Sequence, residues 1–427
     1  MNDERKRRKW VAAALVTCAL IVLFVVILMA KKSDGANQVA LSSSPPQSVV
    51  AEVLKAWSHD QSQSAGKPIA TKTEADAQCT NEHIDLGPNP QVLPEPIVAT
   101  ANRTSAQLTS RLQASVIEKD RAMGYYLEAG LAGQSALRAV VKAYPDCMEE
   151  FTCGTIADQS MAQASAPAID ALVRIAAITH DPAIYATAFN MCRQSNLPAC
   201  KTLTGDQWAA LDPDNAIPWL ETASQASVRK DEAGYLAAMN RAAQARTFEA
   251  RGMPVLDLMQ TDAVRLAAPG ARVALGESLM MIDIVGRQGG GWGLLEYCAP
   301  NATRGSDRQQ VCGQVVETML RSDYSFLDRI MAMGIAKRIG WQPDKMVDIQ
   351  LEFDAMKELV LHEYDSLYGA QTERDGCKRL TTMQAWINDT STLGEVGMLR
   401  KRLGARGITV AEMARRYRAR NRDTKSP

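Results

Sequence analysis

Aromatic side chains are scarce in this chain of 427 residues, where phenylalanine, tyrosine and tryptophan together make up 5%. Strands recruit aromatic and β-branched residues, whereas alanine, leucine, methionine and glutamine favour helices. No alternation of apolar and polar residues between hairpin turns stands out either. These absences, in a chain rich in alanine and methionine, predict an all-α fold.

The motifs that carry well-known chemistries are missing as well. The sequence contains no CxxC pair, no HExxH, no GxSxG and no SxxK with its partner motifs. The glycine-rich GRQGGGWG, from Gly286 to Gly293, lacks the lysine of a P-loop and is interpreted as a turn. We therefore expect no catalytic residue, no metal site and no cofactor. The histidines stand singly, which is more typical of structural positions: His59, His83, His180 and His362.

Net charge is zero over the whole chain, but it is unevenly distributed. Residues 1–32 carry seven basic and two acidic side chains, and residues 395–427 carry ten basic and three acidic ones. The body between them therefore has a net charge of −12. A nucleic-acid-binding domain has the opposite sign, so we expect no nucleic-acid partner.

An uninterrupted apolar run, WVAAALVTCALIVLFVVILMA, extends from Trp10 to Ala30. At a helical rise of ~1.5 Å per residue it reaches about 31 Å, the thickness of a bilayer's hydrocarbon core. The basic RKRRK precedes the run, and only two lysines follow it. The positive-inside rule then predicts a single-pass transmembrane helix in the cytoplasmic (inner) membrane, with the N-terminus inside and the bulk of the chain periplasmic or otherwise extracytoplasmic.

Two other interpretations of the apolar run are a cleaved signal peptide and a buried core helix. The apolar region of a signal peptide is shorter, ~7–15 residues, and ends in a small-x-small cleavage site. Here Leu28 precedes Ala30, a poor match to that site. A core helix of this length would carry charges. A retained signal anchor fits best.

Nine cysteines are present, and the eight beyond the anchor form three close pairs and one distant pair. An oxidising compartment allows such pairs to close and persist. Eight cysteines allow 105 connectivities, but short loops close at the lowest entropic cost. Zinc ligation would require tighter Cys and His spacing. We therefore predict four disulfides: Cys147–Cys153, Cys192–Cys200, Cys298–Cys312 and Cys79–Cys377.

The chain divides into segments of different composition. Ser/Pro-rich polar sequence follows the anchor, four prolines then stand between Gln78 and Thr100, and helical periodicity begins at Thr104. The expected organisation is a basic cytoplasmic N-terminus (1–9), a transmembrane anchor (10–30), a flexible stalk (31–76), an extended Pro-rich arm (77–103), a disulfide-stapled helical domain (104–394) and a basic tail with a terminal helix (395–427).

Helix starts recur within the body. Asp181-Pro182 and Asp212-Pro213 each precede an apolar-periodic stretch, as an aspartate cap followed by proline does. Tyr185 and Trp219 lie 34 residues apart, the tetratricopeptide period. The segment IPWLETASQASVRKDEAGYLAAMNRAAQA resembles a tetratricopeptide-type helical hairpin over one unit and a degraded one before it, about 65 residues. The resemblance implies an α-solenoid; an irregular helical bundle is the alternative.

The segment RKRLGARGITVAEMARRYRARNRD predicts a basic terminal helix. Thr409 and Glu412 have the spacing of a capping box, and Val410, Met413 and Tyr417 fall on one face. Two interpretations are open. The helix docks on the acidic body of its own chain, which is favoured, or it contacts an anionic surface. The residues for such a contact are Arg415, Arg416, Arg418 and Arg420.

Taken together, these features predict a membrane-anchored helical-repeat protein that binds or scaffolds a protein partner in the cell envelope. Stacked helical hairpins form concave grooves suited to peptides or helices. The rival hypothesis is an envelope enzyme of the hydrolase type whose active site carries no recognisable motif. A buried acid pair in a cleft would favour that enzyme.

Overall fold

The computed structural model describes residue 86 and residues 93–144, 154–193, 195, 197–286, 292–299, 307–369 and 376–423, all within the compact unit Ala51–Pro427. The helices are α4 (Glu95–Gln113), α5 (Glu118–Ala143), α7 (Gly154–Ala176), α8 (Pro182–Arg193), η1 (Pro198–Thr202), α9 (Gly205–Leu211), α10 (Ala216–Val228), α11 (Glu232–Gln244), η2 (Val255–Gln260), α12 (Asp262–Arg265), α13 (Pro269–Gly286), α14 (Trp292–Tyr297), α16 (Asp307–Arg321), α17 (Phe326–Ile339), α18 (Pro343–Gly369), α19 (Gly376–Ala405) and α20 (Val410–Asp423). Within these residues the sole strand-like pairing is an isolated bridge between Asn215 and Thr247. The all-α prediction is confirmed.

The structure corrects the expected extended arm. Residues 95–103 are helical, because α4 begins at Glu95 directly after Pro94 and holds Pro96 in its first turn. Proline lacks an N–H group, and the first N–H groups of a helix have no partner within it, so proline in that turn costs no hydrogen bond. The rest of the arm, residues 77–92, lies outside the described residues except for the buried Leu86.

Of the two predicted Asp-Pro helix starts, one is confirmed and one is displaced. Asp181 Oδ1 accepts a 2.7 Å hydrogen bond from Ala183 N at the start of α8. Asp212 instead ends α9, and α10 begins four residues later with Asn215 as its cap. The buried Asn215 side chain bonds Asp212 as well as the backbone of Glu249, 34 residues onward. A long-range contact therefore decided this boundary.

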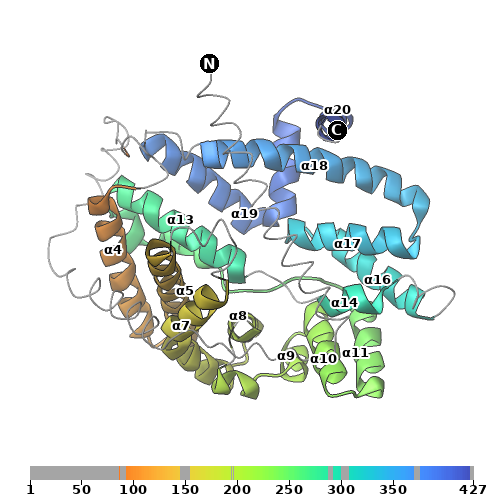
Figure 1. Ribbon diagram of the computed structural model, residues 1–427, viewed down its shortest axis with the longest axis horizontal. Coiled ribbons are helices and arrows are strands. Elements are labelled where there is room, and N and C mark those ends of the chain that lie inside the picture. Colours follow the sequence, from red (N-terminus) through yellow and green to blue (C-terminus); the bar gives the residue numbers. More distant parts are fainter. Residues whose placement is uncertain are drawn as a thin grey trace. The chain divides into compact units, whose positions relative to one another are not determined.

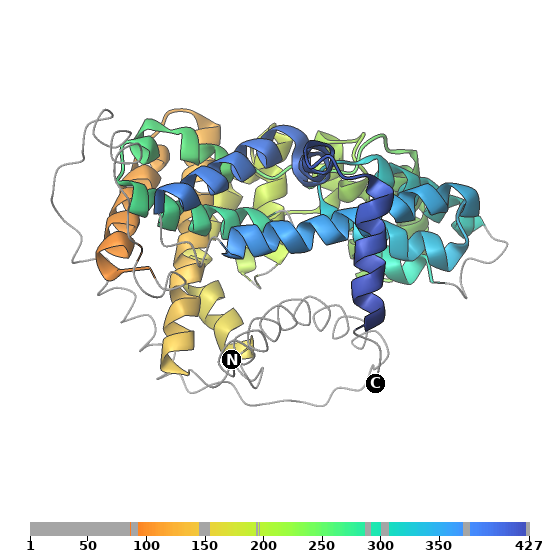
Figure 2. The same cartoon turned by 90° about the horizontal axis from the view of Figure 1, so that it is seen from above.

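Most helices pack on their sequence neighbours, as Figure 1 shows for the order α4, α5, α7 and α8. Figure 2 shows α5 and α7 lying side by side. Helix α13 breaks that order, because it returns from mid-chain to pack against α4, α5 and α19. The Tyr126 hydroxyl of α5 donates a buried 2.9 Å hydrogen bond to the Ile282 carbonyl of α13. In a solenoid each repeat contacts only its neighbours, so this closure favours the irregular bundle.

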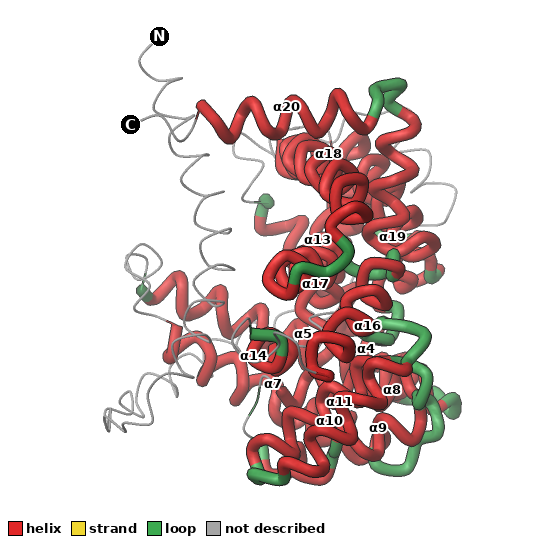
Figure 3. The backbone as a smooth tube through the Cα atoms, turned by 90° about the vertical axis from the view of Figure 1, so that its right-hand side faces the viewer, coloured by secondary structure: helices red, strands yellow, loops and turns green. Residues whose placement is uncertain are grey.

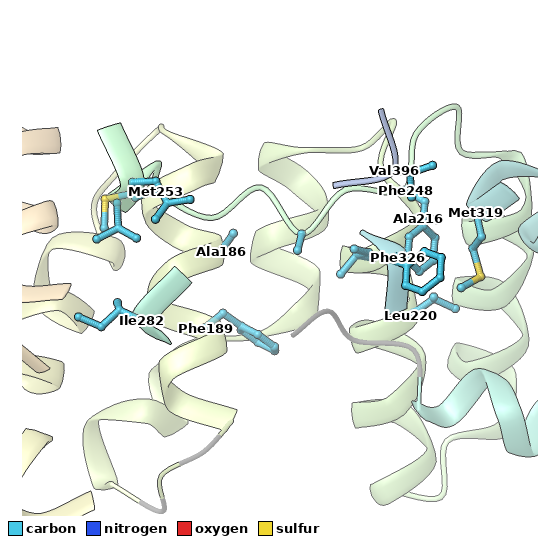
Figure 4. Close-up of a cluster of buried hydrophobic side chains, with 14 of the residues drawn as sticks. Ala186, Phe189, Ala216, Leu220, Phe248, Met253, Ile282, Met319, Phe326 and Val396 are labelled. Carbon is cyan, nitrogen blue, oxygen red and sulfur yellow. The ribbon is translucent and has the colours of Figure 1, made fainter. Parts of the chain in front are cut away.

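A large apolar core cluster joins helices from α4 to α20. Figure 4 shows part of it, with Met253 and Ile282 on one side of the α8 residues and Phe248 and Phe326 on the other. The ring of Phe189 lies 5.3 Å from that of the fully buried Trp208. Aromatic pairs at this spacing add about 0.5–1.5 kcal/mol beyond the area that they bury.

The expected tail boundary at residue 395 is corrected in part. Helix α19 continues across it, with a break at Gly394 where φ is 71°. Val396, Leu399 and Leu403 are buried in the core cluster, so this stretch belongs to the body. The terminal helix itself is confirmed as α20, and Thr409 Oγ1 accepts a 3.2 Å hydrogen bond from Glu412 N as a cap.

Two predicted disulfides are confirmed, Cys192–Cys200 and Cys298–Cys312, with Cα–Cα distances of 5.2 and 5.8 Å. Cys377 is also disulfide-bonded. Its predicted partner Cys79 and the predicted pair Cys147–Cys153 lie outside the described residues, so those two pairings stay predictions.

The predicted anchor, from Trp10 to Ala30, and the predicted stalk, residues 31–76, also lie outside the described residues. Among the helices that are described, none is both long and apolar enough for a membrane span.

Candidate functional site

A groove of about 590 Å³ lies where α17, α18 and α20 meet. Its position follows from the end of α17. Gly340, with φ of 66°, forms a Schellman cap. In this cap Trp341 N donates a 2.9 Å hydrogen bond to the Ala336 carbonyl, and Gly340 N donates a longer one, of 3.4 Å, to the Lys337 carbonyl. This turn sets the Trp341 indole over Gly313 of α16, where a Cβ would lie 3.1 Å from the ring. Trp341 becomes one wall of the groove. We call this cavity the α17–α20 groove.

The floor of the α17–α20 groove is one face of α18. Val347, Gln350 and Asp354 line it and stand at positions i, i+3 and i+7, a spacing that places side chains along one helix face. Val347 is one of several large apolar residues that are exposed, with 69% of its surface accessible. Met346 lies beside it at the apolar end. The groove therefore has an apolar end at Val347 and a charged end at Asp354.

The carboxylate at the charged end is neutralised by its own neighbours. Asp354 Oδ1 accepts from Gln350 Nε2 at 2.7 Å and from Lys357 Nζ at 2.8 Å, and Oδ2 accepts from Arg418 Nε at 2.8 Å. Although partial burial opposes ionisation, the hydrogen bonds from Lys357 and Arg418 hold the pKa of Asp354 below its ordinary value. One carboxylate thus pairs with two cations, and a further cation, Lys337, also lines the groove. The charged end is cationic overall.

Helix α20 reaches this position by docking across α18 (Figure 3). Met413 and Ala414 are buried, and Lys357 Nζ lies 4.3 Å from the centroid of the Tyr417 ring. Arg420 Nη2 bonds Oε1 of Glu358, a side chain with 1% exposure, at 2.6 Å. Ion pairs and a small apolar contact hold the helix on its own body.

The four tail arginines predicted as an anionic-surface contact divide into two pairs. Arg418 and Arg420 bind carboxylates of α18. Arg415 and Arg416 are exposed and share Glu412 of their own helix. The self-docked interpretation describes the first pair, and contact of the second pair with an anionic surface stays a prediction.

A second set of charges holds α17, α18 and α19 together. The buried Arg329 pairs with Glu352, and Arg400 bonds both Glu352 and Asp323. Burial opposes ionisation of Glu352, but hydrogen bonds from Arg400 and the charge of Arg329 keep its pKa below the ordinary value. Burial also lowers the pKa of the Arg329 guanidinium. The role of these four side chains is therefore structural, because their ion pairs hold α17, α18 and α19 against one another.

A buried acid pair of the kind that would favour an enzyme does occur, at the start of α17. Burial, then the nearby charge of Glu395, raise the pKa of Asp328 to about 7. The Glu395 carboxylate caps α17, since its Oε2 accepts from Phe326 N at 2.8 Å, and Ser325 Oγ accepts from the backbone N–H of Asp328 at 3.3 Å. One oxygen of the Asp328 carboxyl, Oδ2, is buried without a hydrogen-bond partner among the described residues. Neither acid lines the α17–α20 groove, so the pair is not part of this candidate site.

A second groove, of about 450 Å³, lies between the end of α11 and α16. Polar side chains, among them Gln314, Glu317 and Arg321, line most of it. Within the described part of the chain, no three acidic, histidine or cysteine side chains stand close enough together to hold a metal ion.

The segment with a tetratricopeptide resemblance forms a hairpin of α10 and α11, joined by residues 229–231. Ala223 and Ala226 are buried between packed helices as expected. Trp219 is half-buried, and its Nε1 donates to the Pro213 carbonyl at 2.9 Å. Before this hairpin, α8 is followed by the five-residue η1 and the seven-residue α9.

The groove residues were missed by motif reasoning. Helix α18 agrees with the all-α prediction, but no motif drew attention to the side chains that line the groove. One usable signal was the Gly340-Trp341 pair, because glycine after a helix followed by an aromatic residue is typical of a Schellman cap. The partner surface on α20 could not be located without the tertiary structure. In comparisons with known proteins, no family model, no curated protein and no solved structure matches the chain.

Proposed function

We propose that the protein is a membrane-anchored, extracytoplasmic binding module and that the α17–α20 groove is where it holds a protein partner. The observation that supports the proposal is the groove itself, about 590 Å³ in volume with an apolar end that includes a 69% exposed valine. Peptide-binding sites combine an apolar surface with a few polar groups that orient the ligand. Trp341, Met346 and Val347 supply the first, and Gln350 and Arg418 the second.

The compartment in this proposal rests on the disulfides and on the predicted anchor. Two confirmed disulfides favour an oxidising compartment. The apolar run from Trp10 to Ala30 would tether the module to the membrane surface. Fusion of alkaline phosphatase after Pro427 tests the topology, and an inactive fusion enzyme contradicts it.

Site-specific photocrosslinking tests the binding role in cells. A benzoylphenylalanine replaces Val347 in one chain and, in a matched control, Val228, an apolar residue of α10 that is more accessible, with 84% exposure. We expect a defined protein adduct from position 347 that position 228 does not give. Identical adducts from both positions, or none from position 347, would contradict a partner in the groove.

A further inference from the structure

We infer that the α17–α20 groove is specific for an extended peptide segment that carries a carboxylate three residues away from a large apolar side chain. This inference rests on the proposed function and adds the chemistry of the partner. It follows from the cations at one end of the groove, the exposed apolar surface at the other end, and the distance between them.

A carboxylate on the ligand is inferred from the part of the Arg418 guanidinium that binds no described residue. Only its Nε bonds Asp354, and its side chain is 45% exposed at the groove. Among the described residues, no hydrogen bond or ion pair engages its two Nη atoms or the Lys337 Nζ. Since Asp354 is already neutralised by Arg418 and Lys357, an incoming carboxylate meets a net positive end. The guanidinium fork matches carboxylate geometry and gives short, charge-assisted hydrogen bonds.

The spacing comes from α18. Val347 and Asp354 are seven residues apart on one face, about 10 Å at a rise of ~1.5 Å per residue. Three residues of chain in the extended polyproline II conformation cover about the same distance, at ~3.1 Å each, and complete one turn, so that both side chains face the groove. A helical ligand of that length would be a cylinder ~10–12 Å wide with a volume of roughly 800 Å³ or more, so much of it would lie outside the groove. An extended segment fits.

Gln350 supports a peptide over a simple lipid acid. It stands between the two ends of the groove, and its Nε2 is committed to Asp354. Its Oε1 is buried and has no hydrogen-bond partner among the described residues. Such an acceptor is costly to leave without a donor. A ligand N–H reaches this oxygen once the Gln350 side chain shifts toward the groove, and a backbone N–H of an extended peptide then supplies the donor that an alkyl chain does not.

The test uses the full chain in detergent micelles and a phage-displayed library of random 12-residue peptides. Selected peptides are labelled, and their Kd values are measured by fluorescence anisotropy on the parent chain and on three variants. Val347→Asn removes the apolar end, and Arg418→Gln removes the fork. Arg420→Gln is the matched control, because it loosens α20 from α18 in the same way without lining the groove.

We expect peptides that bear Asp or Glu three residues from an aromatic or aliphatic residue. Their binding should weaken at least tenfold with Arg418→Gln, the loss typical of a hydrogen bond to a charged group, and stay unchanged with Arg420→Gln. Peptides that depend on Val347 but carry no acid, or that tolerate Arg418→Gln, overturn this inference and leave the proposed function standing. If no selected peptide depends on Val347, both fail.

Competition with octanoate distinguishes a peptide ligand from a lipid acid, because octanoate offers a carboxylate and an apolar chain without amide groups. We expect octanoate to displace the selected peptides only at concentrations far above their Kd. Displacement at or below that Kd would assign the groove to small carboxylic acids and overturn the peptide inference.

Discussion

Gly394 lies directly against the backbone of Asp323, at the point where α19 breaks. Its φ and ψ of 71° and 172° fall in a region that is open essentially to glycine alone, and a Cβ there would strike the Asp323 carbonyl oxygen. The next two N–H groups, of Glu395 and Val396, donate to the carbonyls of Tyr324 and Asp323 at 3.1 and 2.9 Å. Through these two hydrogen bonds, the break in α19 holds the turn that precedes α17.

Replacing this glycine should destabilise the fold. We expect Gly394→Ala to lower the free energy of unfolding by about 3 kcal/mol, since backbone strain and overpacking each cost ~1–3 kcal/mol. Gly334→Ala is the control, because Gly334 is helical and has open space around its Cα. It should stabilise α17 by about 0.5–1 kcal/mol. Urea unfolding measures the free energy of both variants, and equal effects would contradict a stabilising role for the glycine at this break.

Asp328 should make stability depend on pH. Its folded-state pKa of about 7 exceeds the ordinary 3.8, so the folded chain binds the proton more tightly and loses stability as pH rises from about 4 to 7. Asp328→Asn mimics the protonated form. We expect its gain in stability to be small at pH 4 and to grow up to about 4 kcal/mol at pH 8.

Thermal unfolding across this pH range measures the gain of Asp328→Asn. Asp348→Asn, at an exposed position of α18, serves as the control and should give no such trend. A gain for Asp328→Asn that is the same at pH 4 and pH 8 would show that the effect does not come from titration.

The Cys298–Cys312 disulfide should stabilise the domain through its closed loop. The two cysteines are 14 residues apart, which corresponds to about 3 kcal/mol in the chain-entropy account. We expect the Cys298→Ser, Cys312→Ser double variant to lose about that much. The eight-residue separation of Cys192–Cys200 predicts a loss a few tenths of a kcal/mol smaller. Denaturant unfolding under non-reducing conditions compares them, and a loss below ~1 kcal/mol for both would contradict the prediction.

Arg420 should hold α20 in place more strongly than Arg416. Its partner Glu358 is buried, whereas the partner of Arg416 is a residue of its own helix. Exposed pairs contribute less than ~1 kcal/mol and breaking a buried one costs ~3–5 kcal/mol, so a half-exposed Arg420 should contribute about 2 kcal/mol. Arg420→Gln should therefore speed amide hydrogen exchange in α20 about 30-fold. Arg416→Gln should change it less than fivefold, and equal rates for the two variants would contradict this assignment.

Much of the local structure was predictable because it depends on neighbours in the chain. The Asp181 cap, the two short-range disulfides, the α10–α11 hairpin and the Thr409 cap all involve residues within a few turns of one another. The error at Glu95 was also local in origin. Prolines were taken to forbid a helix that they can begin.

The candidate site was settled by contacts between residues far apart in sequence. Composition and periodicity determined that the chain is helical and which helix carries the arginines. Only the tertiary structure placed Arg418 on Asp354, 64 residues away, and Trp341 on Gly313 beside them. A helix pattern specifies which face is apolar, but not which distant helix covers that face, since many partners bury similar area. The groove exists because α17, α18 and α20 leave part of their shared surface uncovered.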